Sequence, residues 1–283
     1  MDIRMRAGWL WRRRAAPSRT SQVVALTRAT FSRPHTPDGD PRAQQRLCAG
    51  MRPVRAGRLT SLQAHLAART RFFDEQVLAA IGQGISQVVI LGAGYDDRAL
   101  RFRAPGVRYF EIDHPATQAY KRRRLARLAA GGSGPVLGAA DFRADDVAAV
   151  LAGCGHDAAA ATLFLCEGLL VYLDAPVIIA LLAGLRSRAA PGSILAASLA
   201  VHPADADTAA VLSAANARRR NGVTEPWVTI LPAADHLDLL AAAGWVSDAA
   251  LDDAELEPGV PARRSLLVTA RPGGARDSAT VGA

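Results

Sequence analysis

The stretch QVVILGAGYDDRALR, residues 87–101, decides the fold of this 283-residue chain. A short and mostly apolar run at 87–91 leads directly into Gly92, Ala93 and Gly94. An acidic pair follows one residue later. This order is typical of a buried strand, a tight glycine turn and the start of a helix. Ligands of open α/β sheets bind outside the carboxyl ends of such strands, so we expect a cofactor at this turn.

Strand-like and helix-like segments alternate from residue 86 onward, which predicts a parallel, doubly wound α/β sheet with right-handed crossovers. Five strands are expected, at 87–91, 107–112, 135–139, 162–166 and 193–199. Two further strands, at 245–250 and 265–270, are close enough in sequence to pair as a hairpin. Apolar residues at helical spacing in 61–81 predict a long helix upstream of the sheet.

The segments group into one large domain with additions at both ends. We expect a basic, disordered tail at 1–18 and a helical cap at 19–85. The sheet domain would span 86–272, followed by a disordered tail at 273–283. The connection at about 202–232 is irregular and too long for an ordinary loop, which suggests a lid or substrate loop.

The net charge of +8 is concentrated at one end of the chain. Residues 1–33 hold eight arginines and one acid, so the rest of the chain is nearly neutral. We interpret these arginines as a solvated tail, and the neutral body argues against a nucleic-acid partner. The N-terminus lacks the apolar region of a secretory signal, and no run approaches the roughly 18 apolar residues of a membrane span.

The three cysteines and six histidines show no metal-site spacing and no C-x-x-C pair. We therefore expect neither a metal nor a disulfide framework, and a reducing cytoplasm is the default location.

Acidic residues follow the later strands, where they can contact a bound cofactor. Glu111 and Asp113 lie 19 and 21 residues beyond Gly92, the distance at which dinucleotide-binding folds place an acid on the ribose. Alternatively, Asp113 caps the next helix. Asp97 occupies the place of the third glycine, so the full G-x-G-x-x-G motif is absent.

Two more candidates follow the third and fourth strands. Asp141 and Phe142 combine an acid with an aromatic ring, which suits an adenine, although a plain turn is the alternative. Glu167 lies among apolar residues, where a carboxylate needs a partner. It would face the glycine turn across the crevice, or else serve as an acid at a helix N-terminus.

Four segments together resemble the leucine carboxyl methyltransferase-like family of S-adenosylmethionine-dependent O-methyltransferases. They are LAARTRFFDEQV (66–77), QVVILGAGYDDRALRF (87–102), YFEIDHPATQAYKRRRL (109–125) and LFLCEGLLVYL (163–173). The resemblance covers roughly residues 20–270. It implies a Rossmann-like class I methyltransferase fold, with a seven-stranded, mostly parallel sheet, helices on both faces and an N-terminal helical cap.

The resemblance also implies roles for the candidate residues in binding S-adenosylmethionine. Arg69 or Arg71 would hold the methionine carboxylate, and the two are not separated by sequence. The glycine turn with Ala93 would line the methionine and ribose, and Asp113 with Glu111 would bind the ribose hydroxyls. Adenine would contact Asp141 and Phe142, and Glu167 would face the amino group. Asp97 departs from the family pattern, where threonine is frequent, which affects loop detail only.

The methyl acceptor is open. A carboxylate needs no base, whereas a hydroxyl benefits from one. His202, after the fifth strand, and Tyr172 are the candidate bases, with a plain loop residue as the alternative for His202. Trp227 is a candidate for the acceptor pocket or for the core. A composition rich in alanine and arginine, with Lys121 as the single lysine, suggests a high-GC bacterium and a small-molecule acceptor from specialised, polyketide-type metabolism.

Three other functions compete with this interpretation. Methylation of a protein carboxyl terminus lacks any recognisable docking surface in the sequence. The missing third glycine and the Glu167 segment count against an NAD(P)-dependent oxidoreductase. A non-catalytic protein that retained the fold would bind the cofactor without turnover.

Overall fold

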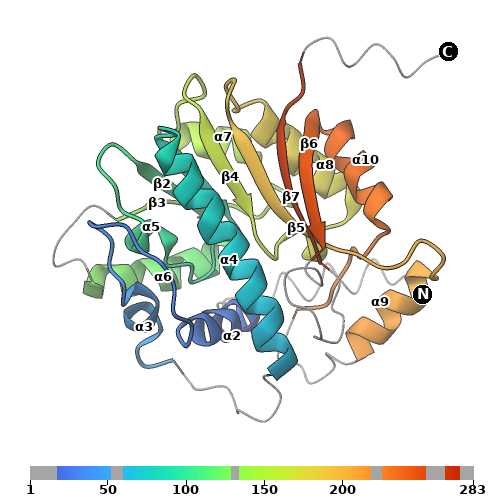
Figure 1. Cartoon of the computed structure of the whole chain (residues 1–283), viewed down its shortest axis with the longest axis horizontal. Helices are drawn as coiled ribbons and strands as arrows, with labels where there is room; N and C mark the ends of the chain where they lie inside the picture. Colours follow the sequence, from blue (N-terminus) through green and yellow to red (C-terminus); the bar gives the residue numbers. More distant parts are fainter. Residues whose placement is uncertain (1–17, 52–59, 129–133, 218–224, 253–264, 275–283) are drawn as a thin grey trace.

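The computed structural model describes residues 18–51, 60–128, 134–217, 225–252 and 265–274. A seven-stranded sheet with the order β3-β2-β1-β4-β5-β7-β6 lies at its centre (Figure 1). The strands are β1 (Gln87–Leu91), β2 (Arg108–Asp113), β3 (Val136–Ala139), β4 (Thr162–Cys166), β5 (Ile194–Ala200), β6 (Trp245–Asp252) and β7 (Ser265–Pro272).

The predicted mixed topology is confirmed. The pairs β1–β2, β1–β4, β2–β3 and β4–β5 are all parallel. The last two strands pair with each other in antiparallel fashion, and β7 also pairs antiparallel with β5. Because the chain order reverses between β1 and β4, their carboxyl ends border the crevice where such sheets bind ligands.

Helices cover both faces of the sheet (Figure 1). One face packs against α4, whose Phe73 and Val77 join Val88 and Ile90 of β1 in one apolar cluster. The opposite face packs against α7, α8 and α10 around Phe164 of β4. The helices are α2 (Arg19–Arg28), α3 (Ala43–Cys48), α4 (Thr60–Gly82), α5 (Arg98–Arg101), α6 (Pro115–Leu128), α7 (Val147–Gly153), α8 (Ala175–Arg186), α9 (Thr208–Ala217) and α10 (Ala233–Ala242), with a 3-10 turn η2 (Leu170–Tyr172).

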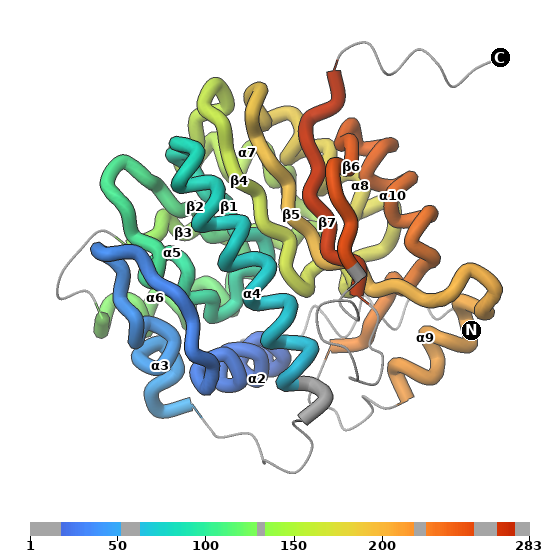
Figure 2. The backbone as a smooth tube through the Cα atoms, in the orientation of Figure 1, coloured from blue at the N-terminus to red at the C-terminus, as the bar shows by residue number. Residues whose placement is uncertain are grey.

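The N-terminal helix α2 lies at the carboxyl end of β1. Ser18 caps it by accepting a hydrogen bond from the Ser21 amide, and the Ser21 side chain reaches the glycine turn after β1. Figure 2 shows α2 beside the N-terminal half of α4, and the two helices are in contact. α2 is thereby placed to close one side of any site at this end of the sheet.

The interpretation of the first 33 residues as a solvated tail is wrong for two of its arginines. Arg28 ends α2, and its side chain is only 6% exposed. Arg33 is 3% exposed at its side chain and bonds Asp74 and Asp97. Both guanidinium groups are buried beside carboxylates, which are Asp96 and Glu167 for Arg28 and Asp74 and Asp97 for Arg33. Most of the predicted tails, residues 1–17 and 275–283, lies outside the described residues.

The connection predicted to be irregular at 202–232 contains a helix, α9. Sequence periodicity missed α9 because none of its residues is buried, so it has no apolar stripe to detect. After residues 218–224, which lie outside the described part, the chain returns along η2, where the Val228 amide donates to the Val171 carbonyl. This return brings residues 225–227 to the same end of the sheet as the glycine turn.

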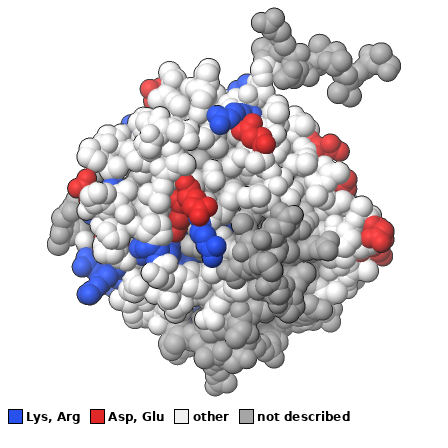
Figure 3. Space-filling model, viewed as in Figure 1, with Lys and Arg blue, Asp and Glu red and all other residues white. Residues whose placement is uncertain are grey.

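None of the described helices combines the length and apolar character that crossing a membrane requires. On the face drawn in Figure 3, acidic and basic side chains are interspersed among uncharged residues.

Candidate functional site

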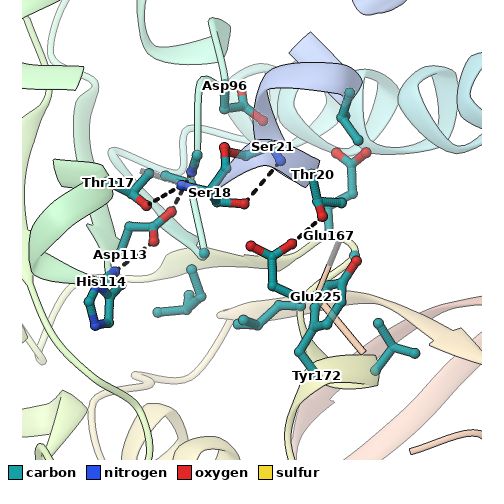
Figure 4. Close-up of a pocket in the computed structure, with 18 of the residues that line it drawn as sticks. Ser18, Thr20, Ser21, Asp96, Asp113, His114, Thr117, Glu167, Tyr172 and Glu225 are labelled. Atoms are coloured by element: carbon teal, nitrogen blue, oxygen red, sulfur yellow. Dashed lines mark hydrogen bonds between the residues drawn. The ribbon is translucent and has the colours of Figure 1, made fainter. Parts of the chain in front are cut away.

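A cavity of about 490 Å³ lies at the carboxyl ends of β1, β2, β3 and β4. Its size is within the range of roughly 300–1,000 Å³ that is usual for small-molecule sites. The strand ends contribute Gly92, Asp113, Ala140 and Glu167 to the lining. α2, α4, η2 and the segment at 225–227 enclose the rest, as Figure 4 shows for several labelled side chains.

The glycine turn after β1 requires both of its glycines. Gly92 and Gly94 have φ angles of +61° and +50°, which side chains rarely tolerate. A Cβ on Gly94 would also lie 2.8 Å from the Cβ of Ser21 on α2. The turn lines the cavity with bare backbone, together with Ala93.

Asp97, at the place of the missing third glycine, is a structural anchor. Its carboxylate accepts from Arg33 Nη1 at 2.6 Å and from Arg101 Nε at 2.7 Å, and the residue is fully buried. These ion pairs fix the start of α5 against the segment after α2. Asp97 therefore stabilises the structure behind the cavity wall. It does not itself line the cavity.

Asp113 lies at the end of β2 and points toward the glycine turn (Figure 4). Its two carboxylate oxygens accept from the backbone amides of Gly94 at 2.5 Å and His114 at 2.6 Å. Burial raises the pKa of this carboxyl, and the two amide donors only partly oppose that shift. The bonds hold the carboxylate at the cavity surface, where it can accept from hydroxyl groups of a ligand.

Glu111 is not part of the cavity lining, which corrects the prediction that it shares a ribose with Asp113. Its side chain is fully buried, and Oε2 lies 2.6 Å from Lys121 Nζ on α6. Burial raises the pKa of Glu111 to about 7, although attraction to Lys121 lowers it in part. The side chain thus joins β2 to α6 beneath the site.

Because the pKa of Glu111 is raised in the folded protein, the free energy of unfolding depends on pH. The folded protein holds this proton more tightly than the unfolded chain, so the contribution of Glu111 to stability falls as pH rises from about 4.5 to about 7. We expect the unfolding free energy of wild type, relative to Glu111→Gln, to drop by about 2–3 kcal/mol across that interval. Chemical denaturation at pH 4.5 and pH 8 measures the difference, and a difference independent of pH would contradict this assignment.

Glu167 is held by three arginines rather than standing alone in an apolar pocket. Its oxygens accept from Arg69 Nε at 3.0 Å and Arg98 Nη1 at 2.7 Å, and also from Arg28 Nη2. Burial alone would favour the neutral acid, but the three guanidinium groups outweigh it and hold the pKa of Glu167 well below its ordinary value. Glu167 is therefore an ionised carboxylate at the cavity wall.

The arginines around Glu167 belong to a larger buried ion cluster. Arg98 also contacts Asp74 at 2.7 Å and Asp96 at 2.5 Å, and Arg28 contacts Asp96 at 3.2 Å. Among the described residues, the connected cluster contains five guanidinium groups and four carboxylates: Arg28, Arg33, Arg69, Arg98 and Arg101 with Asp74, Asp96, Asp97 and Glu167. The cluster has one positive charge more than negative, and Arg28 and Arg69 present it to the cavity.

The structure separates the two arginines that the sequence left open. Arg69 lines the cavity and contacts Glu167, whereas Arg71 is exposed on α4 and outside the lining. Arg28 was missed because composition placed it in the basic tail. Its spacing of three residues from the buried Ala25 is the signal that could have identified it, because both lie on the inner face of α2.

The other predicted residues divide between the cavity and its surroundings. Asp141, Phe142, Tyr172 and Trp227 all line the cavity. His202 does not, which corrects its candidacy as a base. It is buried, with Nδ1 2.7 Å from the Pro203 carbonyl and Nε2 2.9 Å from Thr208 Oγ1, the first residue of α9, so its ring is held by the segment that leads into that helix.

Sequence reasoning also missed cavity residues that come from outside the sheet. Thr20 and Ser21 come from α2, His65 from α4 and Glu225 from the segment after α9. Thr20 donates a hydrogen bond to Glu225, which joins α2 to a segment 205 residues later. No local pattern marks these residues, because only the tertiary fold brings them to the strand ends.

The sequence profile of the leucine carboxyl methyltransferase family matches residues 21–186 of this chain. A "Putative S-adenosyl-L-methionine-dependent methyltransferase" of Parafrankia sp. is 43% identical over 51% of this chain and 48% of that relative. One of the same name from Mycobacterium avium is 37% identical over 72% of this chain and 68% of that relative. The chain thus spans about half to two thirds of the length of these curated relatives.

A crystal structure of a "putative methyltransferase" from Thermobifida fusca has the same fold. The superposition covers 93% of this chain and 97% of that one, with a TM-score of 0.57 and 18% identity. The superposition shows a shared fold, and at 18% identity it shows the fold alone.

Proposed function

The chain belongs to the leucine carboxyl methyltransferase family, and from this membership we propose that it is an S-adenosyl-L-methionine-dependent O-methyltransferase. It would transfer a methyl group to a carboxylate or hydroxyl oxygen of a small molecule. The observation that supports this most directly is the ion cluster at the cavity wall, where Arg28, Arg69 and Glu167 meet.

This cluster fits the amino-acid end of S-adenosylmethionine, which has one carboxylate and one ammonium group. A carboxylate would offset the excess positive charge that Arg28 and Arg69 present. Glu167 stays ionised and would accept from the ammonium group. A zwitterion therefore exchanges partners with an existing ion pair and leaves no buried charge uncompensated.

The remaining strand-end residues fit the nucleoside. Asp113 would accept from ribose hydroxyls beside Gly92 and Gly94. Asp141 and Phe142 would contact the adenine, with the ring packing on its face. S-adenosylmethionine has no pyrophosphate, so a third glycine for close phosphate approach is unnecessary.

Bound in this cavity, S-adenosylmethionine would supply a methyl group carried on a positively charged sulfur. An acceptor oxygen would bond to the methyl carbon and displace the sulfur. The protein would contribute mainly position and exclusion of water. α2 and the segment at 225–227 enclose the cavity, with Thr20 and Glu225 joined across it. Apolar lining residues, Leu169, Val171 and Leu173, suit an apolar acceptor. Together with the composition, they support a small molecule of bacterial specialised, polyketide-type metabolism.

Calorimetry on a matched pair of variants tests the proposal. Wild type should bind S-adenosylhomocysteine and give no signal with NADH. Arg69→Met should weaken S-adenosylhomocysteine binding about tenfold to a hundredfold, the equivalent of one charge-assisted contact of roughly 1.5–3 kcal/mol. Arg71→Met, two residues along the same helix and outside the cavity, should bind as wild type. Binding of NADH alone, or equal losses in the two variants, would overturn the assignment.

A further inference from the structure

The cavity has two halves of different origin. The glycine turn, Asp113 and Glu167 belong to the strand ends and fit the cofactor under the proposed function. The other half is built by Thr20, Tyr172 and Glu225, together with apolar side chains. Figure 4 shows these side chains directed into the cavity from α2, η2 and the segment after α9. An acceptor must occupy this second half, because the first half is filled by the nucleoside and amino acid.

Glu225 is the acidic side chain that the second half contributes to the lining. The residue is 5% exposed and lines the cavity, and its Oε2 accepts from the Thr20 hydroxyl. A carboxylate has about four acceptor positions, so this bond is compatible with a further contact to a ligand. The hydrogen bond to α2 also fixes the orientation of the carboxylate with respect to the cavity.

We infer that Glu225 is the base that receives the proton of a hydroxyl acceptor, so that this enzyme forms methyl ethers of apolar alcohols or phenols. The inference rests on the proposed function. It selects hydroxyl acceptors over carboxylates, because a carboxylate acceptor would have to approach a second buried carboxylate in a site that excludes water.

The reaction balances with the groups present. The acceptor oxygen forms the new bond to the methyl carbon, and the electron pair of the broken carbon–sulfur bond stays on sulfur. The hydroxyl proton passes to an oxygen of Glu225 and then to water after the product leaves. A carboxylic acceptor would have no proton to give and no use for this base.

The nature of the product gives the first test. Wild type is incubated with methyl-tritiated S-adenosylmethionine and an organic-solvent extract of host metabolites, and the products are treated with mild alkali. Methyl esters release labelled methanol, whereas methyl ethers retain the label. We expect label that is stable to alkali and does not partition into dilute acid as an amine. Volatile labelled methanol or a labelled amine would overturn the inference.

A charge-removing variant gives the second test. Glu225→Gln should transfer label at least about a hundredfold more slowly, the lower range for loss of a general base, and still bind S-adenosylhomocysteine within twofold of wild type. Glu225→Asp keeps a carboxylate and should lose less. Glu75→Gln, an exposed glutamate on α4 outside the cavity, is the matched control and should behave as wild type. Transfer by Glu225→Gln at the wild-type rate would overturn the inference.

The two proposals fail in different ways. If wild type does not bind S-adenosylhomocysteine, or transfers no label to any component, the proposed function is wrong. If it binds the cofactor product and forms methyl esters, only the role of Glu225 and the acceptor class are wrong. Thermal unfolding of each variant identifies one that does not fold, and Thr20→Val, which removes the hydrogen bond to Glu225, then supplies a milder loss of transfer to measure.

Discussion

Glu167→Ala is expected to lower the free energy of unfolding by about 3–5 kcal/mol, the cost of removing one partner from a buried ion pair. The carboxylate that neutralises Arg28, Arg69 and Arg98 disappears, and three guanidinium groups then share the remaining acids. Their like charges repel one another where the side chains are largely buried and poorly screened by solvent. Denaturant titration at pH 7 measures the loss, and the exposed Glu75→Ala should unfold as wild type.

The loss should also depend on pH in a defined direction. The pKa of Glu167 is depressed in the folded protein, so its stabilising contribution is complete above the ordinary value of 4.5 and disappears as pH falls toward the depressed value. The difference between wild type and Glu167→Ala should therefore be constant from pH 6 to pH 8 and shrink in acid. Equal stability of the two proteins at pH 7 would show that the cluster is not held as described.

The same variant should lose affinity for S-adenosylhomocysteine. This loss is interpretable only under conditions in which the variant is folded, which the denaturation curve establishes. Glu167→Gln serves as the comparison, because it preserves the volume and still removes the charge. Affinity in Glu167→Gln equal to that of wild type would mean that the ammonium group is bound elsewhere.

The strand ends were predictable from sequence because the relevant signals are local. The run before Gly92, the acid at the end of β2 and the glutamate after β4 each lie within a few residues of a recognisable strand. Parallel pairing then brings these ends to one edge of the sheet. Sequence alone therefore predicts that Asp113, Asp141 and Glu167 lie at one site, and all three line the cavity.

The partners of these residues were not predictable in the same way. Arg28 and Glu167 are 139 residues apart in sequence, and Thr20 and Glu225 are 205 apart. Each arginine of the cluster resembles an ordinary surface charge when read alone. His202 shows the opposite error. Its position after β5 predicts a catalytic base, whereas its side chain contacts Thr208 of α9. Sequence position gives the strand end but not the direction of a side chain.

Asp113→Ala is expected to weaken S-adenosylhomocysteine binding at least about a hundredfold. A hydrogen bond to a charged group contributes roughly 1.5–3 kcal/mol, and a ribose offers two hydroxyls to this carboxylate. The substitution also releases the amide of Gly94, so the turn loses its anchor on β2. Calorimetry measures the affinity, and Asp38→Ala, which changes an exposed loop acid outside the cavity lining, is the control.

Asp113→Asn should separate function from stability. Burial raises the pKa of Asp113, so its charged form is disfavoured in the fold and its stability contribution falls as pH rises. Asparagine has no charge to bury, but its single carbonyl oxygen can accept from only one of the Gly94 and His114 amides. We therefore expect Asp113→Asn to be less stable than wild type, with a smaller difference at pH 8 than at pH 4, because wild type alone loses stability as Asp113 ionises. Its affinity for S-adenosylhomocysteine should still fall about tenfold, because a neutral acceptor replaces a charged one. Wild-type affinity in this variant would exclude Asp113 from the ribose site, whereas weakened binding by the folded variant would support a direct contact between this carboxylate and the ligand.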